Sequence, residues 1–263
     1  MKHRWRQSAA GILAALLMTT SAGAVGATIE IDGTSLSSSE AWIENGTSYV
    51  TLAAFCRETG RTLSWKGSSA QIDGKGLSLE AIFGAIYVLS NDRALYLGEE
   101  VQVVNGRSVL PLRVLADASG ATLSWDWDTA TASLDTQGAV PPQASYDGED
   151  LYWLSRIISA ESKGEPLLGQ IAVGNVVLNR TRSEQFPDTV KEVIFDSQYA
   201  VQFTPVANGT IYQEPTASAV LAAKLCLEGA SVVGDSLYFF APAVSAGSWI
   251  TQNRTYYAAI GNH

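Results

Sequence analysis

Glu161 is the residue in this sequence whose type and position best suit a catalytic role. It follows an apolar helical pattern in which Leu154, Ile157 and Ile158 share one face, and its spacing places it on that same face. Burial makes a carboxyl group harder to ionise, so its pKa rises towards the range that a general acid needs. Such an acid can protonate the leaving oxygen of a glycosidic bond. A buried salt bridge or a frayed helix end is the structural alternative.

A second carboxylate, Glu165, lies four residues further on, between Gly164 and Pro166. It is the obvious candidate for a catalytic partner, but we expect it to support the structure by capping the next helix through that helix's first amides. We assign the same supporting role to Asn179 and Arg180, as hydrogen-bonding groups between elements.

Two helices joined by a polar elbow must hold these residues. The first is predicted to begin near residue 148, and the second to run from Pro166 to about Arg180. Farther along, the pattern predicts two helices (188–194 and 215–228), a loop (198–205) and two strands (236–241 and 255–260). Residues 148–263 are therefore predicted to form a mainly helical domain with a small β element.

An internal repeat with an offset of 60 residues organises the N-terminal half, in which residues 45–65 match residues 105–125. Each copy has an Asn-Gly turn, a strand, a helix closed by glycine and a strand that reads Thr-Leu-Ser-Trp. We expect short strands over 27–31 and 100–104 to lead into the two turns. Residues 28–135 are predicted to pack as one α+β unit, and the Pro- and Gly-containing stretch 136–147 as a linker. The predicted fold class of the whole chain is α+β.

Residues 1–27 resemble a secretory signal peptide, with three basic residues, a short apolar run and a small-residue cleavage site. An uncleaved membrane anchor is the alternative. The formal net charge of −9 argues against a nucleic-acid partner or an electrostatic hold on anionic lipid. We expect no membrane span in the mature chain.

Histidine and cysteine are scarce, and this excludes several chemistries. The two histidines, His3 and His263, lie at the ends of the chain, so a histidine-based zinc or copper site and a Ser-His-Asp triad are not expected. We predict no metal and no cofactor. Cys56 and Cys226 lie in apolar helical patterns and are expected to be buried thiols rather than a disulfide.

The repeat pattern N-G-x-S-x-x-x-L with G-x-T-L-S-W resembles the copper amine oxidase N-terminal-like domain of secreted bacterial proteins. The resemblance implies an accessory or envelope-targeting module, with a spacer that binds nothing as the alternative. Because residues 28–135 contain no histidine, the family name implies no copper here.

The stretch ISAESKGEPLLGQIAVGNVVLNR, residues 158–180, is similar to the signature of the SleB/CwlJ family of cell-wall hydrolases. Shorter pieces agree at residues 186–187, 202–203, 237–239 and 260–263. The resemblance implies a lysozyme-like fold that cleaves the peptidoglycan strand between N-acetylmuramic acid and N-acetylglucosamine. It also implies that Glu161 is the acid/base.

These observations predict a secreted or envelope enzyme, with the spore cortex as one possible site, that degrades peptidoglycan glycan strands as a lytic transglycosylase. A hydrolytic muramidase, a muramoyl-alanine amidase and an inactive wall-binding protein are the alternatives. Histidine scarcity opposes the amidase, and the retained Glu161 opposes the inactive protein. The candidate substrate-binding residues are Gln170, Gln202, Phe203, Tyr238 and Phe240.

Overall fold

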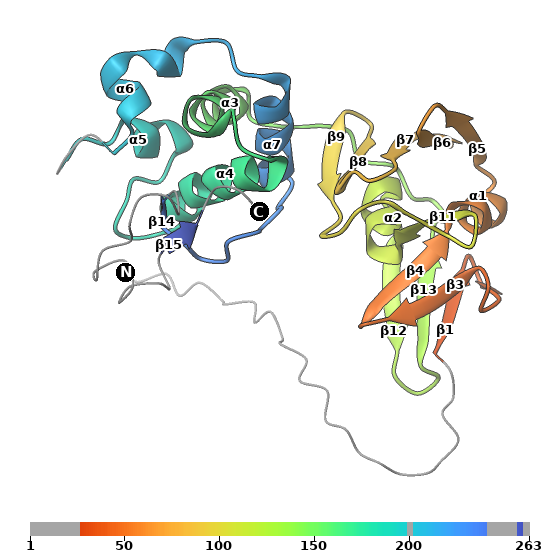
Figure 1. The fold of residues 1–263 in the computed structure, drawn as a ribbon. Coiled ribbons are helices and arrows are strands. Elements are labelled where there is room, and N and C mark those ends of the chain that lie inside the picture. The colour runs from red at the N-terminus through yellow and green to blue at the C-terminus, as the bar shows by residue number, and fades with distance from the viewer. Residues whose placement is uncertain (1–26, 199–201, 241–256, 260–263) are drawn as a thin grey trace.

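A computed structural model of the chain describes residues 27–198, 202–240 and 257–259, and the predicted signal peptide lies almost wholly outside these ranges (Figure 1). A strand-rich N-terminal part is followed by a helical C-terminal part, and each part has its own cluster of buried apolar residues. The fold class is therefore α+β, as the sequence predicts.

The sequence repeat of the N-terminal part is also a repeat of structure. The first copy forms β3 (Ala41–Glu44), β4 (Thr47–Thr51), α1 (Leu52–Thr59), β5 (Thr62–Lys66) and β6 (Ser69–Gly74). The second copy forms β10 (Gln102–Val104), β11 (Arg107–Pro111), α2 (Leu112–Ser119), β12 (Thr122–Asp126) and β13 (Thr131–Asp135). Gly60 and Gly120 end the two helices in the left-handed conformation, both with φ of 67°, which glycine adopts at little cost.

The two copies join through their hairpins. Strand β4 pairs with β11 in antiparallel register, with Val50 opposite Leu110, and this gives a sheet of order β10-β11-β4-β3. Two further sheets, of order β12-β13-β1-β2 and β5-β6-β7-β8-β9, complete the part. They add β1 (Thr28–Ile31), β2 (Thr34–Ser35), β7 (Leu77–Ile82), β8 (Tyr87–Ser90) and β9 (Arg93–Tyr96).

One predicted strand has a different partner. The strand at 27–31 was expected to lead into the first Asn-Gly turn, but β3 takes that place, and β1 pairs in parallel with β13 of the second copy. Ile29 and Ile31 are buried there, so the first strand of the N-terminal part packs its apolar side chains into the core beside the last strand. The expected hairpin partner was wrong because strand spacing does not specify which distant edge a strand will cover.

The C-terminal part is built on α3 (Gly148–Ser162), α4 (Leu167–Thr181) and α7 (Ala217–Leu227), close to the predicted helices. Gly174 permits the tight approach of these helices, because a Cβ atom there would lie 2.6 Å from Cys226 Sγ and 2.9 Å from Ile158 Cδ1. Cys226 and Cys56 are both buried free thiols, which confirms the prediction that they do not form a disulfide.

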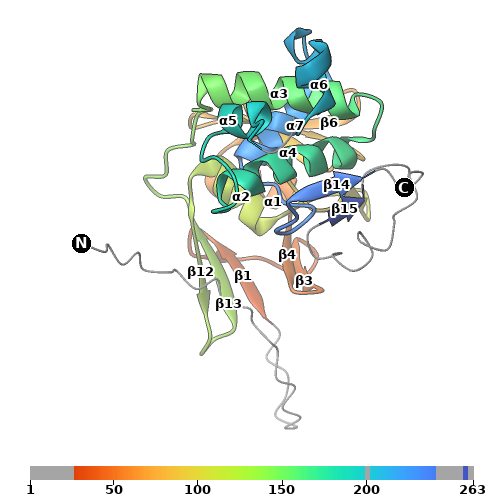
Figure 2. The same ribbon diagram turned by 90° about the vertical axis from the view of Figure 1, so that its left-hand side faces the viewer.

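Shorter elements surround the three long helices. They are α5 (Val190–Phe195), α6 (Thr204–Asn208), the 3-10 turn η1 (Thr210–Tyr212) and the parallel pair β14 (Tyr238–Phe240) and β15 (Tyr257–Ala259). Figure 2 shows β14 and β15 beside α4. The sequence predicted α5 and both strands but not α6. Among the described residues, no helix is long and apolar enough to cross a bilayer.

The stretch 136–147 packs on the N-terminal part instead of spanning freely between the two parts. A Cβ atom on Gly120 would lie 2.3 Å from the Val140 carbonyl oxygen, and the Tyr146 hydroxyl accepts a 3.3 Å hydrogen bond from the Ala94 amide. Ala94 itself is fully buried within the apolar cluster of the helical part. The hairpin of β8 and β9 therefore docks on α7, and the two parts share an interface.

Candidate active site

Glu161 lies in the last turn of α3, whose register is fixed at both ends. At its start, Asp147 Oδ1 accepts hydrogen bonds from the amides of Glu149 (2.9 Å) and Asp150 (3.0 Å). Along its length, the apolar face of Leu154, Ile157 and Ile158 is completely buried. This register holds Glu161 at the edge of the core, half-buried.

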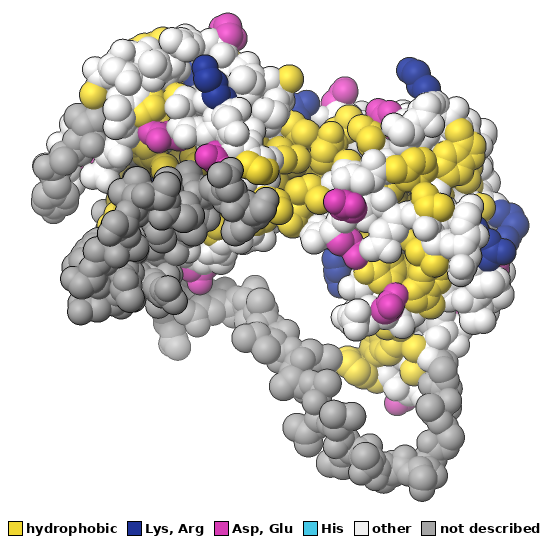
Figure 3. Space-filling view, in the orientation of Figure 1, with side chains coloured by type: hydrophobic (Ala, Val, Ile, Leu, Met, Phe, Trp, Pro, Cys, Tyr) yellow, Lys and Arg dark blue, Asp and Glu magenta, His cyan; other side chains and the backbone are white. Residues whose placement is uncertain are grey.

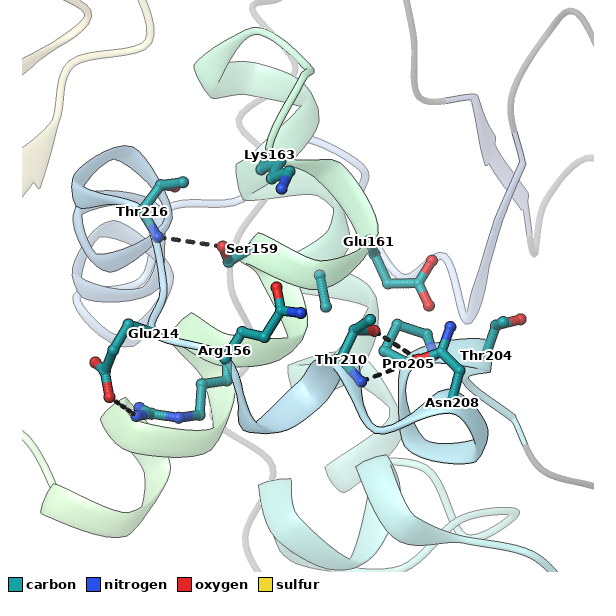
Figure 4. A pocket seen from close by; sticks show the side chains of 12 residues that line it. Arg156, Ser159, Glu161, Lys163, Thr204, Pro205, Asn208, Thr210, Glu214 and Thr216 are labelled. Atoms are coloured by element: carbon teal, nitrogen blue, oxygen red, sulfur yellow. Dashed lines mark hydrogen bonds and ion pairs between the residues drawn. The ribbon is translucent and has the colours of Figure 1, made fainter.

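The carboxyl group of Glu161 is partly desolvated and faces a cavity. Burial raises its pKa above the ordinary value, and desolvation is the cause. No hydrogen bond or ion pair to this carboxyl is found in the part of the chain that the structure describes. Figure 4 shows it pointing from α3 towards α6. There it lines a cavity of about 400 Å³. A carboxylic acid that is partly desolvated, uncommitted and open to a cavity can deliver a proton to a bound molecule.

The cavity lies between the end of α3, α6, η1 and the segment that leads into α7. Its polar lining residues are Arg156, Ser159, Glu161, Lys163, Thr204, Asn208, Thr210, Gln213, Glu214 and Thr216. Ser159 Oγ accepts a 3.1 Å hydrogen bond from the Thr216 amide, which ties the α7 segment to α3. The walls therefore come from segments far apart in the sequence.

Asn208 is a cavity residue that the sequence reasoning missed. Its Oδ1 accepts from the Thr210 amide (3.0 Å) and from Thr210 Oγ1 (2.7 Å), so its amide nitrogen remains available to the cavity. Figure 4 shows that nitrogen on the side that Glu161 faces. The available signal was the Asn-Gly pair, because Gly209 has a φ of 79° and ends α6 at this turn.

Glu214 is the second carboxylate of the cavity, and it is already paired with Arg156. It is 88% exposed and pairs with Arg156 Nη2 at 2.8 Å, and that guanidinium lies 3.7 Å from the centre of the Tyr152 ring. All the acidic residues of the sequence fall within the described ranges. Of these, Glu161 and Glu214 line the cavity.

Glu165 lies outside the cavity lining, and its predicted capping role is wrong. Helix α4 has Pro166 at its N-cap and no side-chain cap bond. The Glu165 side chain packs over Gly169, where a Cβ atom would lie 3.1 Å from Glu165 Cβ. Gln170 Nε2 donates to the Glu165 carbonyl oxygen at 2.9 Å, so these residues shape the elbow between α3 and α4.

Two of the five predicted substrate-binding residues are buried. Gln170 is 3% and Phe203 2% exposed, and the Phe203 ring packs 6.4 Å from that of Phe239. Tyr238 is half-buried beside Arg180, Gln202 precedes α6, and Phe240 lies in β14 with its side chain outside the described residues. As described, the cavity is lined by none of these five. Buried Phe203 offers no open face for stacking and instead supports the start of α6.

Asn179 and Arg180 fasten the segment before β14 to α4. Asn179 Nδ2 donates to the carbonyls of Gly234 (2.7 Å) and Ser236 (2.9 Å), and Arg180 Nε donates to that of Leu237 (2.8 Å). The Arg180 guanidinium also lies over three aromatic rings, those of Phe186, Phe203 and Tyr238. Within the described ranges, no group of three potential metal-ligating side chains is found.

Two family models match the chain, and together they account for most of it. The Cell Wall Hydrolase model matches residues 164–263, and the Copper amine oxidase N-terminal domain model matches residues 30–134. The first match begins three residues after Glu161. The second confirms the resemblance drawn from the repeat.

Similar proteins agree with the first match. The spore cortex-lytic enzyme of Bacillus cereus is 39% identical over 118 residues, or 45% of this chain and 44% of that protein. The enzyme of the same name from Halalkalibacterium halodurans is 36% identical over 132 residues, or 50% of this chain and 38% of that protein. The solved catalytic domain of the Bacillus cereus SleB protein is 39% identical, with 41% of this chain and 81% of that one covered and a TM-score of 0.37. The chain thus spans less than half the length of the curated relatives it matches.

Proposed function

Since the C-terminal part of this chain belongs to the cell wall hydrolase family, we propose that the protein cleaves peptidoglycan glycan strands in the cell envelope as a lytic transglycosylase. The observation that carries this proposal is Glu161, a partly desolvated carboxyl group open to a polar cavity. We propose residues 148–263 as the catalytic domain and residues 28–135 as the accessory domain, joined by residues 136–147.

In the first step, Glu161 acts as the acid. Burial raises the pKa of Glu161 and so favours its protonated form, and the proton passes to the oxygen between N-acetylmuramic acid and N-acetylglucosamine. The bond between that oxygen and C1 of muramic acid breaks as positive charge develops at C1. The carboxylate of Glu161 remains beside that charge.

In the second step, Glu161 acts as the base. Its carboxylate removes the proton of the 6-hydroxyl of the same muramic acid, and O6 attacks C1 to close a 1,6-anhydro ring. Glu161 returns to its acid form, and no water is consumed. One carboxyl group therefore serves both steps.

The acidic residues around the cavity favour this route over hydrolysis. Retaining hydrolysis needs a second carboxylate about 5 Å from the first, and inverting hydrolysis needs one at roughly 6.5–9.5 Å to activate water. Glu214 is exposed and held by Arg156, and Glu165 lies outside the cavity. An attacking hydroxyl supplied by the substrate removes the need for a second free carboxylate.

Hydrogen-bonding groups on the cavity wall fit a sugar that carries N-acetyl and hydroxyl groups. The Asn208 amide nitrogen is oriented by Thr210, and Thr204 lies beside it on α6. We infer that Asn208 donates to an acetamido or hydroxyl oxygen of the bound sugar. The relatives are spore cortex-lytic enzymes, and we extend the cortex to this chain as a proposed substrate.

The assignment of Glu161 is tested by comparing two neighbouring glutamates. Glu161→Gln is expected to lower the rate of muropeptide release at least about a hundredfold, the usual effect of losing a general acid. Glu165→Gln is the matched control, because it makes the same change four residues away outside the cavity, and it should retain most of the activity. Similar rates for wild type and Glu161→Gln would exclude Glu161 as the catalytic acid.

A further inference from the structure

A second and larger groove lies on the N-terminal part, away from Glu161. It has a volume of about 940 Å³ and runs between β4, the loop after β9, α2 and β12. Its walls carry two partly exposed tryptophans, Trp125 (38%) and Trp127 (70%), whose rings pack edge to face with 5.8 Å between centroids. Figure 3 shows hydrophobic side chains gathered with acidic ones over β4, α2 and β12. Exposed tryptophans grouped in a groove indicate a binding surface.

The groove also carries polar groups held in place. The Tyr49 hydroxyl donates to the Glu99 carboxylate, which accepts a further 3.0 Å hydrogen bond from Gln102 Nε2. The Trp42 ring stacks on the Tyr49 ring with 5.9 Å between centroids, and this contact helps to hold Tyr49 in position at this end of the groove. Arg113 and Asp117 add an exposed cation and anion along α2.

We propose that this groove binds a glycan strand of peptidoglycan, so that the accessory domain holds the polymer that the catalytic domain cleaves. The identification of this polymer as peptidoglycan rests on the proposed function. Sugar rings have an apolar face that stacks on indole and a rim of hydroxyls that needs donors and acceptors. Trp125 and Trp127 supply the first requirement, and Glu99, Arg113 and Asp117 supply the second.

The charge of the groove and of the chain favours this occupant. The chain has a formal net charge of −9, and the groove contains both Glu99 and Asp117, so a nucleic acid would be repelled. A sugar polymer needs no excess of positive charge. Carboxylates are also common partners of sugar hydroxyls, which donate to them in charge-assisted hydrogen bonds.

Arg93 links the groove to the catalytic part. Arg93 Nη1 donates to the carbonyl oxygen of Asp117, a groove residue, at 3.1 Å. The same guanidinium pairs with Glu228 at the end of α7, a helix that packs on α3 and α4. The groove and the Glu161 cavity thus belong to parts held together, and binding at one raises the effective concentration of polymer at the other.

The first copy of the repeat supplies a matched control residue for the test. Trp65 is the counterpart of Trp125 in the first copy and is 56% exposed, but it stacks on Phe83 outside the groove. The full chain carrying Glu161→Gln, which leaves the polymer intact, is sedimented with insoluble peptidoglycan stripped of attached secondary polymers. Adding Trp125→Ala with Trp127→Ala should raise Kd at least about tenfold, whereas adding Trp65→Ala should change it less than about twofold.

A second measurement separates binding from catalysis and from misfolding. With Glu161 present, the variant lacking both groove tryptophans should digest short soluble glycan fragments at the wild-type rate but insoluble peptidoglycan more slowly. Trp127→Phe should recover part of the binding, because a ring remains.

Equal Kd values for the groove variant and the Trp65→Ala control would overturn the proposal, as would a tryptophan-dependent dimer or a protein ligand without polymer binding. Tryptophan-dependent binding by a chain that releases no muropeptides would contradict the proposed function and leave the groove assignment standing.

Discussion

Arg93 in β9 and Glu228 at the end of α7 form the ion pair that joins the two parts of the chain. Arg93 Nε lies 3.0 and 3.1 Å from the two carboxylate oxygens, and Nη2 lies 2.6 Å from Oε2. Each side chain is only 14% exposed. Planar, two-pronged pairs of this kind are among the stronger charged contacts in proteins, and this one fixes the orientation of the β8–β9 hairpin on α7.

Arg93→Gln is therefore expected to destabilise the protein by about 1–3 kcal/mol, because Glu228 would keep its charge at low exposure without a partner. Denaturant unfolding measures the change. Lys191→Gln is the control, since it breaks an ion pair with Glu149 whose side chains are 50% and 59% exposed, and we expect no measurable effect. Equal effects of the two changes would show that the Arg93 pair does not hold the interface.

Glu161→Gln should change stability in a pH-dependent way. Burial raises the pKa of Glu161, so ionising this group costs more free energy in the native state than in the unfolded state. The free energy of unfolding therefore falls as pH rises from the ordinary glutamate pKa through the raised pKa. Glutamine cannot ionise. The variant should therefore melt at a higher temperature than wild type at about pH 8, and the difference should vanish towards about pH 4, below the ordinary glutamate pKa. A constant difference across this range would contradict the desolvation of Glu161.

The activity of the wild type should fall on the alkaline side for the same reason. The first step needs protonated Glu161, and that form is depleted as pH rises through the raised pKa. The pH profile of kcat/KM on soluble fragments measures this limb. An alkaline limb at the ordinary glutamate pKa would show that burial does not tune the acid.

Asn208→Ala should lower kcat/KM about tenfold, chiefly through KM, since it removes a hydrogen-bond donor from the cavity wall. Thr210→Val tests the orientation of the same amide, because it removes one of the two donors that hold Oδ1. Its effect should be smaller and in the same direction. Wild-type KM values for Asn208→Ala would exclude this residue from sugar binding.

Gly174→Ala should destabilise the helical part by about 1–3 kcal/mol, since the added methyl would meet Cys226 Sγ. Combining it with Cys226→Ala removes the sulfur atom, so the loss in the double variant should be less than the sum of the single losses. Thermal or denaturant unfolding of the four proteins gives the coupling. Additive losses would show that the clash is relieved elsewhere.

Local patterns predicted the elements whose causes are local. Asn-Gly turns and glycine C-caps specify the hairpins and helix ends of the repeat, and apolar spacing specifies α3 and α4. The inward position of Glu161 follows from the same spacing. These features depend on residues within one or two helical turns of each other.

Features that depend on distant partners could not be predicted in this way. Strand β1 pairs with β13 about a hundred residues away, and Ala94 is buried against helices that follow it by more than fifty residues. Asn208 reaches the cavity because α6 folds back over the end of α3. Phe203 carries an aromatic ring suited to sugar stacking, but its burial beside Arg180 is decided by packing.

The most direct test of the central claim is the chemistry of the product ends. Peptidoglycan is digested with the wild-type chain, and the released muropeptides are analysed by mass spectrometry with and without chemical reduction. If Glu161 acts first as acid and then as base towards the sugar's own hydroxyl, the muramic acid ends carry 1,6-anhydro rings and resist reduction. Glu161→Gln should release neither product. Reducing muramic acid ends from the wild-type chain would show that water attacks C1 and would contradict the transglycosylase account.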